Sequence, residues 1–430
     1  MAETSTQMCR IGLARAILPV MQTRPEILAP AGNPEKLETA LHFGADAVYL
    51  GLKRFSMRSA GGNFDDDELE WAIAYAHERD RRVYVALNIQ PFDSDFPGLG
   101  TTLRRLSALG PDAVIVGDAG VLALARREAP ALPLHLSTQM SVTNAEAARW
   151  WLEQGLERII VARELDLGQL GAIAAACPGR IEAFVHGAVC IAYSGRCLLS
   201  LYWAGRDTRR GECTQSCRWP YREIEDRRRP GEPNPVEEDE RGTHFFDAKD
   251  LCALPLLDRL VATGVASLKI EGRTRSAYYA GITTDVYRQA VHLLAAGELA
   301  TFEARIPALL EELARPHFRG FSTHFLGGEA NDPESFNPQG SFRDGRTDFL
   351  GRVVAGRTDG LLVQVINPIR EGEALELRDR GLLCELHTPT PLLDGDGRRV
   401  AMARTGGRVL LTGTFRSGVG ALVRRAEGVR

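Results

Sequence analysis

The chain has 430 residues, of which 44% are hydrophobic and 25% are charged, and its formal charge is −4. This composition excludes a fibrous or disordered protein, and the length favours two domains around a large core. The net negative charge excludes attraction to nucleic acid by the whole surface, so binding of RNA would need a local basic patch.

The N-terminal segment, residues 1–24, is predicted to be a loose leader. Its short apolar stretch at 11–21 is interrupted by Arg15 and Pro19, and no clear cleavage site follows. No apolar run in the sequence approaches the ~20 residues that a membrane-spanning helix needs. The sequence therefore predicts a soluble, cytoplasmic protein that does not enter a membrane.

From residue 25 onward, short β-rich runs alternate with amphipathic helical patterns. Apolar strands that are each followed by a helix are typical of a parallel sheet buried on both faces. Eight such units favour a TIM-type (β/α)8 barrel, and a doubly wound open sheet is the alternative. Asn33 can cap the first helix, and Pro34 suits its first turn. The expected strands span residues 25–32, 47–53, 82–89, 113–118, 133–142, 158–164, 181–190 and 267–273.

The seventh unit is predicted to carry an insertion at 191–266, which is far longer than an ordinary crossover. Its middle, 225–241, is charged and proline-rich, which favours a mobile loop. Two helices are expected at 276–297 and 301–315, which complete a barrel domain over 25–335.

A different pattern begins after this barrel domain. Apolar and polar residues alternate between glycine turns, which predicts a small C-terminal β-barrel domain at 341–430, with a β-sandwich as the alternative. This domain holds one cysteine and no ionisable cluster with catalytic spacing, so we expect it to position a substrate. The alternative is that it only packs against the barrel and stabilises it.

The cysteines are the sharpest chemical feature of the sequence. The pattern Cys190-x6-Cys197-x15-Cys213-x3-Cys217 offers four thiols, and Cys252 follows. Four thiolates can hold a tetrahedral zinc ion or a cubane iron–sulfur cluster. The spacing lacks the two close pairs of a usual structural zinc site. Clustered thiols in a reducing compartment indicate metal binding or catalysis, and burial as small apolar residues is the alternative.

The insertion is also rich in arginine, which supplies the local basic patch that RNA binding would need. An arginine-rich loop that is merely solvated is the alternative. The arginines predicted to contact RNA are Arg206, Arg209, Arg210 and Arg218.

Ionisable residues lie near the ends of the last two expected strands. Lys269, Glu271 and Arg273 alternate along the eighth strand, and His186 lies along the seventh. Polar residues at the carboxyl ends of barrel strands face a common site, so catalytic roles are predicted for His186, Glu271 and Arg273. A structural Lys–Glu–Arg ion network is the alternative. Other candidates for lining the same pocket are Asn88, Gln139, Asn144 and Arg163.

Four segments resemble the peptidase U32 family. The run from Glu182 through His186, Cys190 and Cys197 to Ser200 resembles the signature of that family. The segment PEILAPAGNPEKLETALHFGADAVYLG and the later DAKDLC and SLKIEGRTRSAYYAG are also similar to it. The resemblance extends over residues 25–430 and is strongest to members that serve tRNA 5-hydroxyuridine synthesis.

This resemblance implies a 4Fe-4S cluster and hydroxylation of the wobble uridine of tRNA, with prephenate as a required metabolite. It implies the ligands Cys190, Cys197, Cys213 and Cys217, with Cys252 as a substitute for one of the outer two. The family name implies a second possibility, a collagenase-like peptidase, although the sequence has no HExxH or GxSxG motif. A non-catalytic, cluster-bearing RNA-binding factor is the third. None of these three hypotheses identifies an electron donor.

Overall fold

The structure is a computed structural model that describes residues 24–58, 62–190, 192–193, 196–218, 238–239, 242–243, 248–316, 318–328, 335 and 348–426. The predicted leader therefore lies almost wholly outside the described residues, as does the predicted mobile loop at 225–241. No helix in the described ranges is long and apolar enough to cross a membrane.

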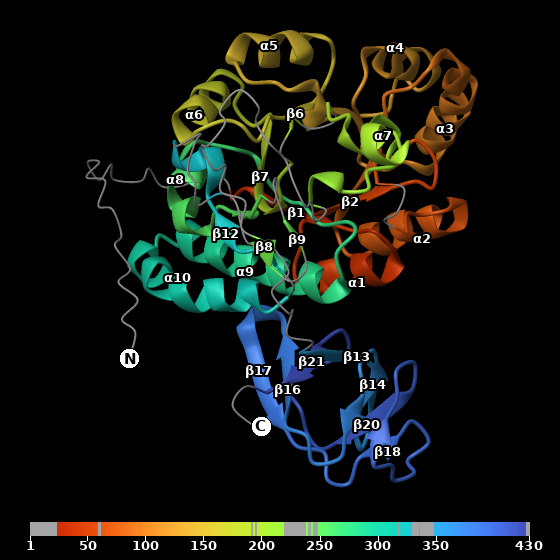
Figure 1. Cartoon of the computed structure of the whole chain (residues 1–430), viewed down its shortest axis with the longest axis vertical. Helices are drawn as coiled ribbons and strands as arrows, with labels where there is room; N and C mark the ends of the chain where they lie inside the picture. Colours follow the sequence, from red (N-terminus) through yellow and green to blue (C-terminus); the bar gives the residue numbers. More distant parts are fainter. Residues whose placement is uncertain are drawn as a thin grey trace.

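Eight parallel strands form a closed barrel, which confirms the predicted fold (Figure 1). The strands pair in chain order from β1 to β7, and β11 pairs with both β7 and β1, which closes the ring. All eight fall within the ranges expected from the sequence. They are β1 (Glu26–Pro30), β2 (Ala47–Gly51), β3 (Arg82–Leu87), β4 (Ala113–Val116), β5 (Leu134–Leu136), β6 (Arg158–Ile160), β7 (Ile181–Ala188) and β11 (Ser267–Ile270).

Helices surround the barrel and cover the outer face of its strands (Figure 1). Side chains at their first turns cap them: Asn33 Oδ1 accepts from the Lys36 backbone N–H at 3.0 Å, as the sequence predicted. Asn144 caps α5 in the same way. The surrounding helices are α1 (Pro34–His42), α2 (Asp66–His77), α3 (Phe96–Leu109), α4 (Ala119–Glu128), α5 (Ala145–Glu153), α6 (Leu167–Ala176), α8 (Leu257–Ala262), α9 (Ala277–Ala295) and α10 (Leu299–Ala314).

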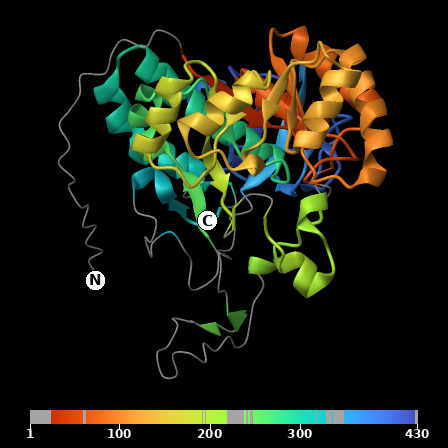
Figure 2. The same ribbon diagram turned by 90° about the horizontal axis from the view of Figure 1, so that it is seen from above.

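The insertion after β7 leaves the barrel and returns along it. Its last strand, β10 (Asp250–Cys252), pairs antiparallel with β7 and carries the short strand β12 (Phe321–Ser322) on its other edge. In between, α7 (Leu199–Ala204) and the short 3-10 helices η4 (Thr208–Arg210) and η5 (Ser216–Arg218) stand out from one face of the barrel, as Figure 2 shows. The described part of the insertion also contains β8 (Glu238–Asp239) and β9 (Gly242–Thr243).

The C-terminal β domain packs beside α1, α9 and α10 (Figure 1). It is one seven-stranded antiparallel sheet with its own apolar core. This confirms the predicted C-terminal β domain, and among the described strands its end strands β17 and β18 are not paired with each other. The strands, in sheet order, are β17 (Leu383–His387), β16 (Leu375–Asp379), β21 (Leu422–Arg425), β13 (Phe349–Arg357), β14 (Gly360–Val365), β20 (Arg408–Thr412) and β18 (Leu393–Asp394), with β15 (Ile369–Arg370) and β19 (Met402–Ala403) as a separate pair.

Candidate active site

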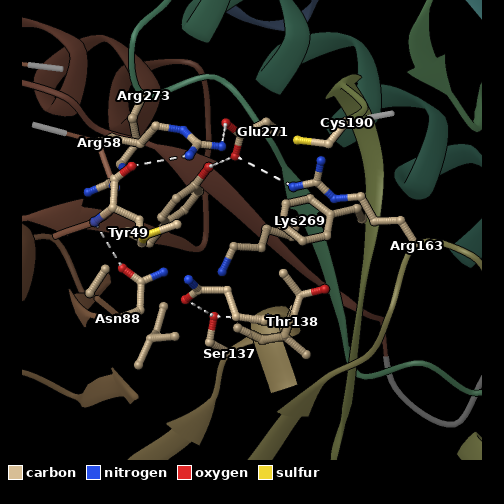
Figure 3. A pocket seen from close by; sticks show the side chains of 16 residues that line it. Tyr49, Arg58, Asn88, Ser137, Thr138, Arg163, Cys190, Lys269, Glu271 and Arg273 are labelled. Carbon is tan, nitrogen blue, oxygen red and sulfur yellow. Dashed lines mark hydrogen bonds and ion pairs between the residues drawn. The ribbon is translucent and has the colours of Figure 1, made fainter. Parts of the chain in front are cut away.

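A pocket opens at the carboxyl ends of the barrel strands, where the loops after the strands converge (Figure 3). The sequence placed Lys269, Glu271 and Arg273 at this site, and all three line it. Asn144, in contrast, caps α5 and is not among the lining residues. The lining consists of Tyr49, Met57, Arg58, Ala86, Asn88, Ile115, Ser137, Thr138, Gln139, Ile160, Arg163, Phe184, Cys190, Lys269, Glu271 and Arg273.

Glu271 lies at the centre of the charged side of the pocket. Its carboxylate is 3.5 Å from Arg58 Nη2 and 3.9 Å from Arg163 Nη2, and it accepts a hydrogen bond of 3.2 Å from the Tyr49 hydroxyl. Burial alone would raise the pKa of Glu271, but Arg58, Arg163 and Arg273 together lower it below its ordinary value. Glu271 is therefore ionised at neutral pH.

Arg273 and Lys269 are fixed by partners other than Glu271. Arg273 Nη1 donates to Ser56 Oγ at 2.9 Å, and it lies so close to Gly51 that a Cβ atom there would come within 2.0 Å of it. Lys269 Nζ donates to Glu182 Oε1 at 2.8 Å, deeper in the barrel. Burial lowers the pKa of Arg273 to about 10, so it stays charged near neutral pH. The ion pairs therefore differ from the Lys–Glu–Arg network considered from the sequence, because Lys269 pairs with Glu182 and Glu271 pairs with Arg58 and Arg163.

The pocket has more positive charge and more donors than its own residues satisfy. Lys269 is balanced by Glu182, but Arg58, Arg163 and Arg273 also line the pocket, and Glu271 is the one carboxylate among the lining residues. Two buried donor groups, Gln139 Nε2 and Arg163 Nε, have no hydrogen-bond partner in the described structure. Buried donors without partners are costly. The pocket is therefore suited to a ligand that brings oxygen acceptors and negative charge.

His186 does not reach the pocket. The pairing of β7 with β11 shifts by one residue between Phe184 and His186, so the alternation of side chains is broken there. Phe184 lines the pocket, whereas His186 packs among the rings of Tyr279, Tyr287 and Phe321. Burial lowers the pKa of His186 to about 3, which keeps it neutral. The structure thus separates this predicted catalytic residue from Glu271 and Arg273.

Two of the four cysteines expected to bind a metal, Cys190 and Cys213, lie near the pocket. Cys190 lines the pocket, and Cys213 is exposed in the insertion. Glu271 raises the pKa of Arg58 above its ordinary value, and the nearby thiols of Cys190 and Cys213 add to that effect. Cys197 and Cys217 are half-buried. Within the described ranges, however, no three potential ligands are gathered closely enough to hold a metal ion.

Cys252, the substitute ligand, has a different environment. It is buried, and its Sγ atom is 3.8 Å from the Tyr287 hydroxyl. Burial raises the pKa of this thiol to about 11, which opposes formation of a thiolate. It is paired with His186 across β10 and β7, away from the pocket lining. Its surroundings fit a packed core cysteine and do not fit a cluster ligand.

Two of the four arginines predicted to bind RNA are occupied within the protein. Arg210 forms a two-point ion pair with Asp95, at 2.8 and 3.1 Å, and Arg209 pairs with Asp207 at 2.8 Å. The pair with Asp95 holds the insertion against the segment after β3, whereas Asp207 belongs to the insertion itself. Arg206 is exposed. The side chain of Arg218 lies outside the described part of the structure.

Several pocket residues were not anticipated from the sequence, among them Tyr49, Arg58, Ser137 and Phe184. Tyr49 and Phe184 belong to strands whose burial was predicted, so inward alternation could have identified them. Arg58 follows β2 in a loop, and no periodic signal marks the direction in which a loop side chain points.

Comparison with known proteins supplies the last observation on this site. The sequence model of Peptidase family U32 matches residues 32–335. The chain is 36% identical over 394 residues to tRNA hydroxylation protein P of Escherichia coli, which covers 82% of this chain and 86% of that protein. It is 32% identical over 366 residues to the 23S rRNA 5-hydroxycytidine C2501 synthase of the same organism, a match that covers 83% of this chain and 53% of that enzyme. It is 28% identical over 394 residues to a collagenase of Porphyromonas gingivalis, a match that covers 83% of this chain and 92% of that protein.

Proposed function

This chain belongs to peptidase family U32, and from that premise we propose that it hydroxylates RNA, with tRNA as its substrate and the cytoplasm as its location. The observation that carries the proposal is the similarity, over most of both chains, to a protein named for tRNA hydroxylation. The finer proposal is conversion of the wobble uridine to 5-hydroxyuridine.

The pocket supports this proposal because it can receive a base and an anion together. Tyr49 and Phe184 give it aromatic walls, and the unpaired Nε2 of Gln139 can donate to a base carbonyl. Arg58, Arg163 and Arg273 suit a carboxylate-bearing co-substrate, and prephenate is such a compound. Glu271 is a weak base because its pKa is lowered, which favours an orienting role for it over proton transfer.

We further propose Cys190, Cys197, Cys213 and Cys217 as the residues that would hold a 4Fe-4S cluster. Their donor chemistry fits, since thiolates are the usual ligands of such clusters, and all four belong to one segment, residues 190–217, which begins at the pocket. Their described positions are not yet gathered around one point, so no step is assigned to the cluster. When bound, it would supply one-electron redox chemistry. Its electron donor is not assigned.

Proteolysis is the second candidate, and the similarity to a collagenase favours it. The pocket argues against it, because nucleophilic hydrolysis needs a nucleophile next to a base. The lining contains Cys190 and Ser137 but no histidine. His186, the histidine closest in sequence to Cys190, is packed among aromatic rings instead.

The proposed function can be tested by mass spectrometry of nucleosides from total tRNA. A strain that lacks the gene should lose hydroxylated uridine, and a plasmid with the natural gene should restore it. The gene with Arg58→Ala should not restore it, whereas Trp150→Ala, on the outer surface of α5, should. Unchanged nucleosides in the deletion strain, combined with cleavage of denatured collagen by the purified protein, would support proteolysis instead.

A further inference from the structure

The insertion carries an exposed aromatic surface that the pocket does not explain. On α7, Tyr202 is 79% exposed and Trp203 is 51% exposed. This helix stands out from the face of the barrel at which the insertion leaves it (Figure 2). Large rings are usually buried because exposing them to water is unfavourable. Two adjacent exposed rings on a projecting helix therefore indicate a surface that is covered by a ligand.

The fold holds these rings outward. The inward side of α7 is Ser200, which is buried, and its hydroxyl is 3.2 Å from Ser216 Oγ and accepts a hydrogen bond from the Thr214 backbone N–H. The helix is thus fixed by its polar side. The rings of Tyr202 and Trp203 meet edge to face, with centroids 5.0 Å apart at 82°. This contact holds the two rings at a fixed angle to each other.

Two exposed arginines that flank the rings in the sequence favour an anionic ligand. Arg196 and Arg206 flank them in the sequence and are exposed, and no ion pair is found for either within the described ranges. Arg209 and Arg210, in contrast, are neutralised by Asp207 and Asp95. The chain as a whole is negative. A positive, aromatic surface on an acidic protein matches the arginine and aromatic composition of sites that bind single-stranded nucleic acid.

The surface is also fixed close to the pocket. The Gln90 backbone N–H donates to the Arg209 carbonyl at 3.1 Å, which joins the insertion to the loop after β3. Gly211 lies so close to the backbone of Ser56 and Met57 that a Cβ atom there would come within 2.5 Å of the Ser56 carbonyl. Met57 itself lines the pocket. A strand of RNA with one base in the pocket would therefore bring its neighbouring bases to α7.

We propose that Tyr202 and Trp203 form a stacking platform for unpaired RNA bases, with Arg196 and Arg206 beside it for the phosphates. The proposal rests on the proposed function and extends it. It assigns to the insertion the recognition of a single-stranded loop next to the base that enters the pocket. A base can stack on any aromatic face, so the platform selects unpaired RNA and does not read sequence.

The test is binding of the full-length protein to an RNA hairpin with a single-stranded loop, with a fully paired RNA duplex as the second probe. Tyr202→Ala and Trp203→Ala should each weaken hairpin binding about tenfold, since one stacked base contributes roughly 1–3 kcal/mol. Duplex binding should change little. Tyr202→Phe, which keeps the ring, should bind like the natural protein. Trp150→Ala removes a similarly exposed ring, 53% exposed on α5, and should have no effect.

Two outcomes would overturn the platform. Hairpin binding that is unchanged in both alanine variants would do so directly. Changed sedimentation of the RNA-free variants, with unchanged RNA binding, would assign the surface to a protein contact instead. Failure of the proposed function looks different: the deletion strain would keep its hydroxylated uridine, while loss of hairpin binding in the alanine variants would still support the platform.

Discussion

Arg378 of the C-terminal domain and Asp285 of α9 form an ion pair of 2.9 Å in which each side chain is only 1% exposed. Asp285 also accepts hydrogen bonds from the backbone N–H groups of Gly381 and Leu382. Arg424 makes a second bridge to Glu312 of α10, at 2.9 Å, in which the glutamate is 20% exposed. The two domains are therefore joined through one fully buried and one largely buried ion pair.

Breaking this pair should destabilise the whole chain. Arg378→Ala leaves Asp285 charged and buried, so we expect the free energy of unfolding to fall by about 3–5 kcal/mol. Urea denaturation followed by circular dichroism measures it. Arg425→Ala is the matched control, because its pair with Glu373 is partly exposed and should contribute less than about 1 kcal/mol. Equal losses in the two variants would contradict the buried-pair explanation.

The same contact bears on the stability of the barrel without its C-terminal domain. A chain that ends near Pro338 would leave Asp285 and Glu312 without their arginine partners. We therefore expect this truncated chain to aggregate. Aggregation would show that the C-terminal domain stabilises the barrel, besides any role in positioning substrate. A soluble, cooperatively folding truncated chain would show that the domain is dispensable for stability.

Glu271 should stabilise the folded protein in a pH-dependent manner. Its folded pKa is lowered, so its contribution is complete above the unfolded value near 4.5 and is lost as pH falls through the folded value. Glu271→Gln should cost about 3 kcal/mol at pH 7, because Arg58 loses its partner. Melting temperatures of the natural protein and of Glu271→Gln at pH 7 and at acid pH test this. The difference in melting temperature between the two proteins should shrink at acid pH. Asp66→Asn, at an exposed pair with Arg105, should show little effect.

The cysteines should divide into two groups by their environment. Anaerobically purified protein should contain about four irons and four sulfides per chain. Cys197→Ser or Cys213→Ser should remove most of the brown colour, whereas Cys252→Ser should keep it because Cys252 is buried against Tyr287. Iron analysis and visible absorption measure both. Recovery of zinc alone, with no iron after reconstitution, would contradict the proposed cluster.

The arginines of the insertion should also differ in their effects. Arg206→Ala should weaken RNA binding several-fold and reduce the salt slope by about 1, as expected for one phosphate contact. Arg210→Asp should instead loosen the insertion, because it breaks the pair with Asp95, and adding Asp95→Arg should restore it. Limited proteolysis of the insertion measures this loosening in Arg210→Asp and its reversal in the double variant. A restored charge pair without restored protection would contradict the anchoring role.

Much of the fold was determined by the sequence itself. Local periodicity and capping, which a sequence displays directly, identified the barrel strands and the helix cap at Asn33. They also identified the change to alternating apolar and polar residues that marks the C-terminal β domain. Alternation along the eighth strand also identified Glu271 and Arg273 as pocket residues. For such features the prediction needed only the pitch of a strand or helix and the burial of one face.

The tertiary structure alone decided the other features. One shift in pairing turned His186 away from the pocket, although it follows Phe184 by two residues. Arg210 met Asp95, 115 residues earlier in the chain, and so became an anchor for the insertion. Arg58 entered the pocket from a loop, and Arg378 reached Asp285 from another domain. Each of these contacts depends on which distant segments approach one another in space, and local periodicity carries no information about that.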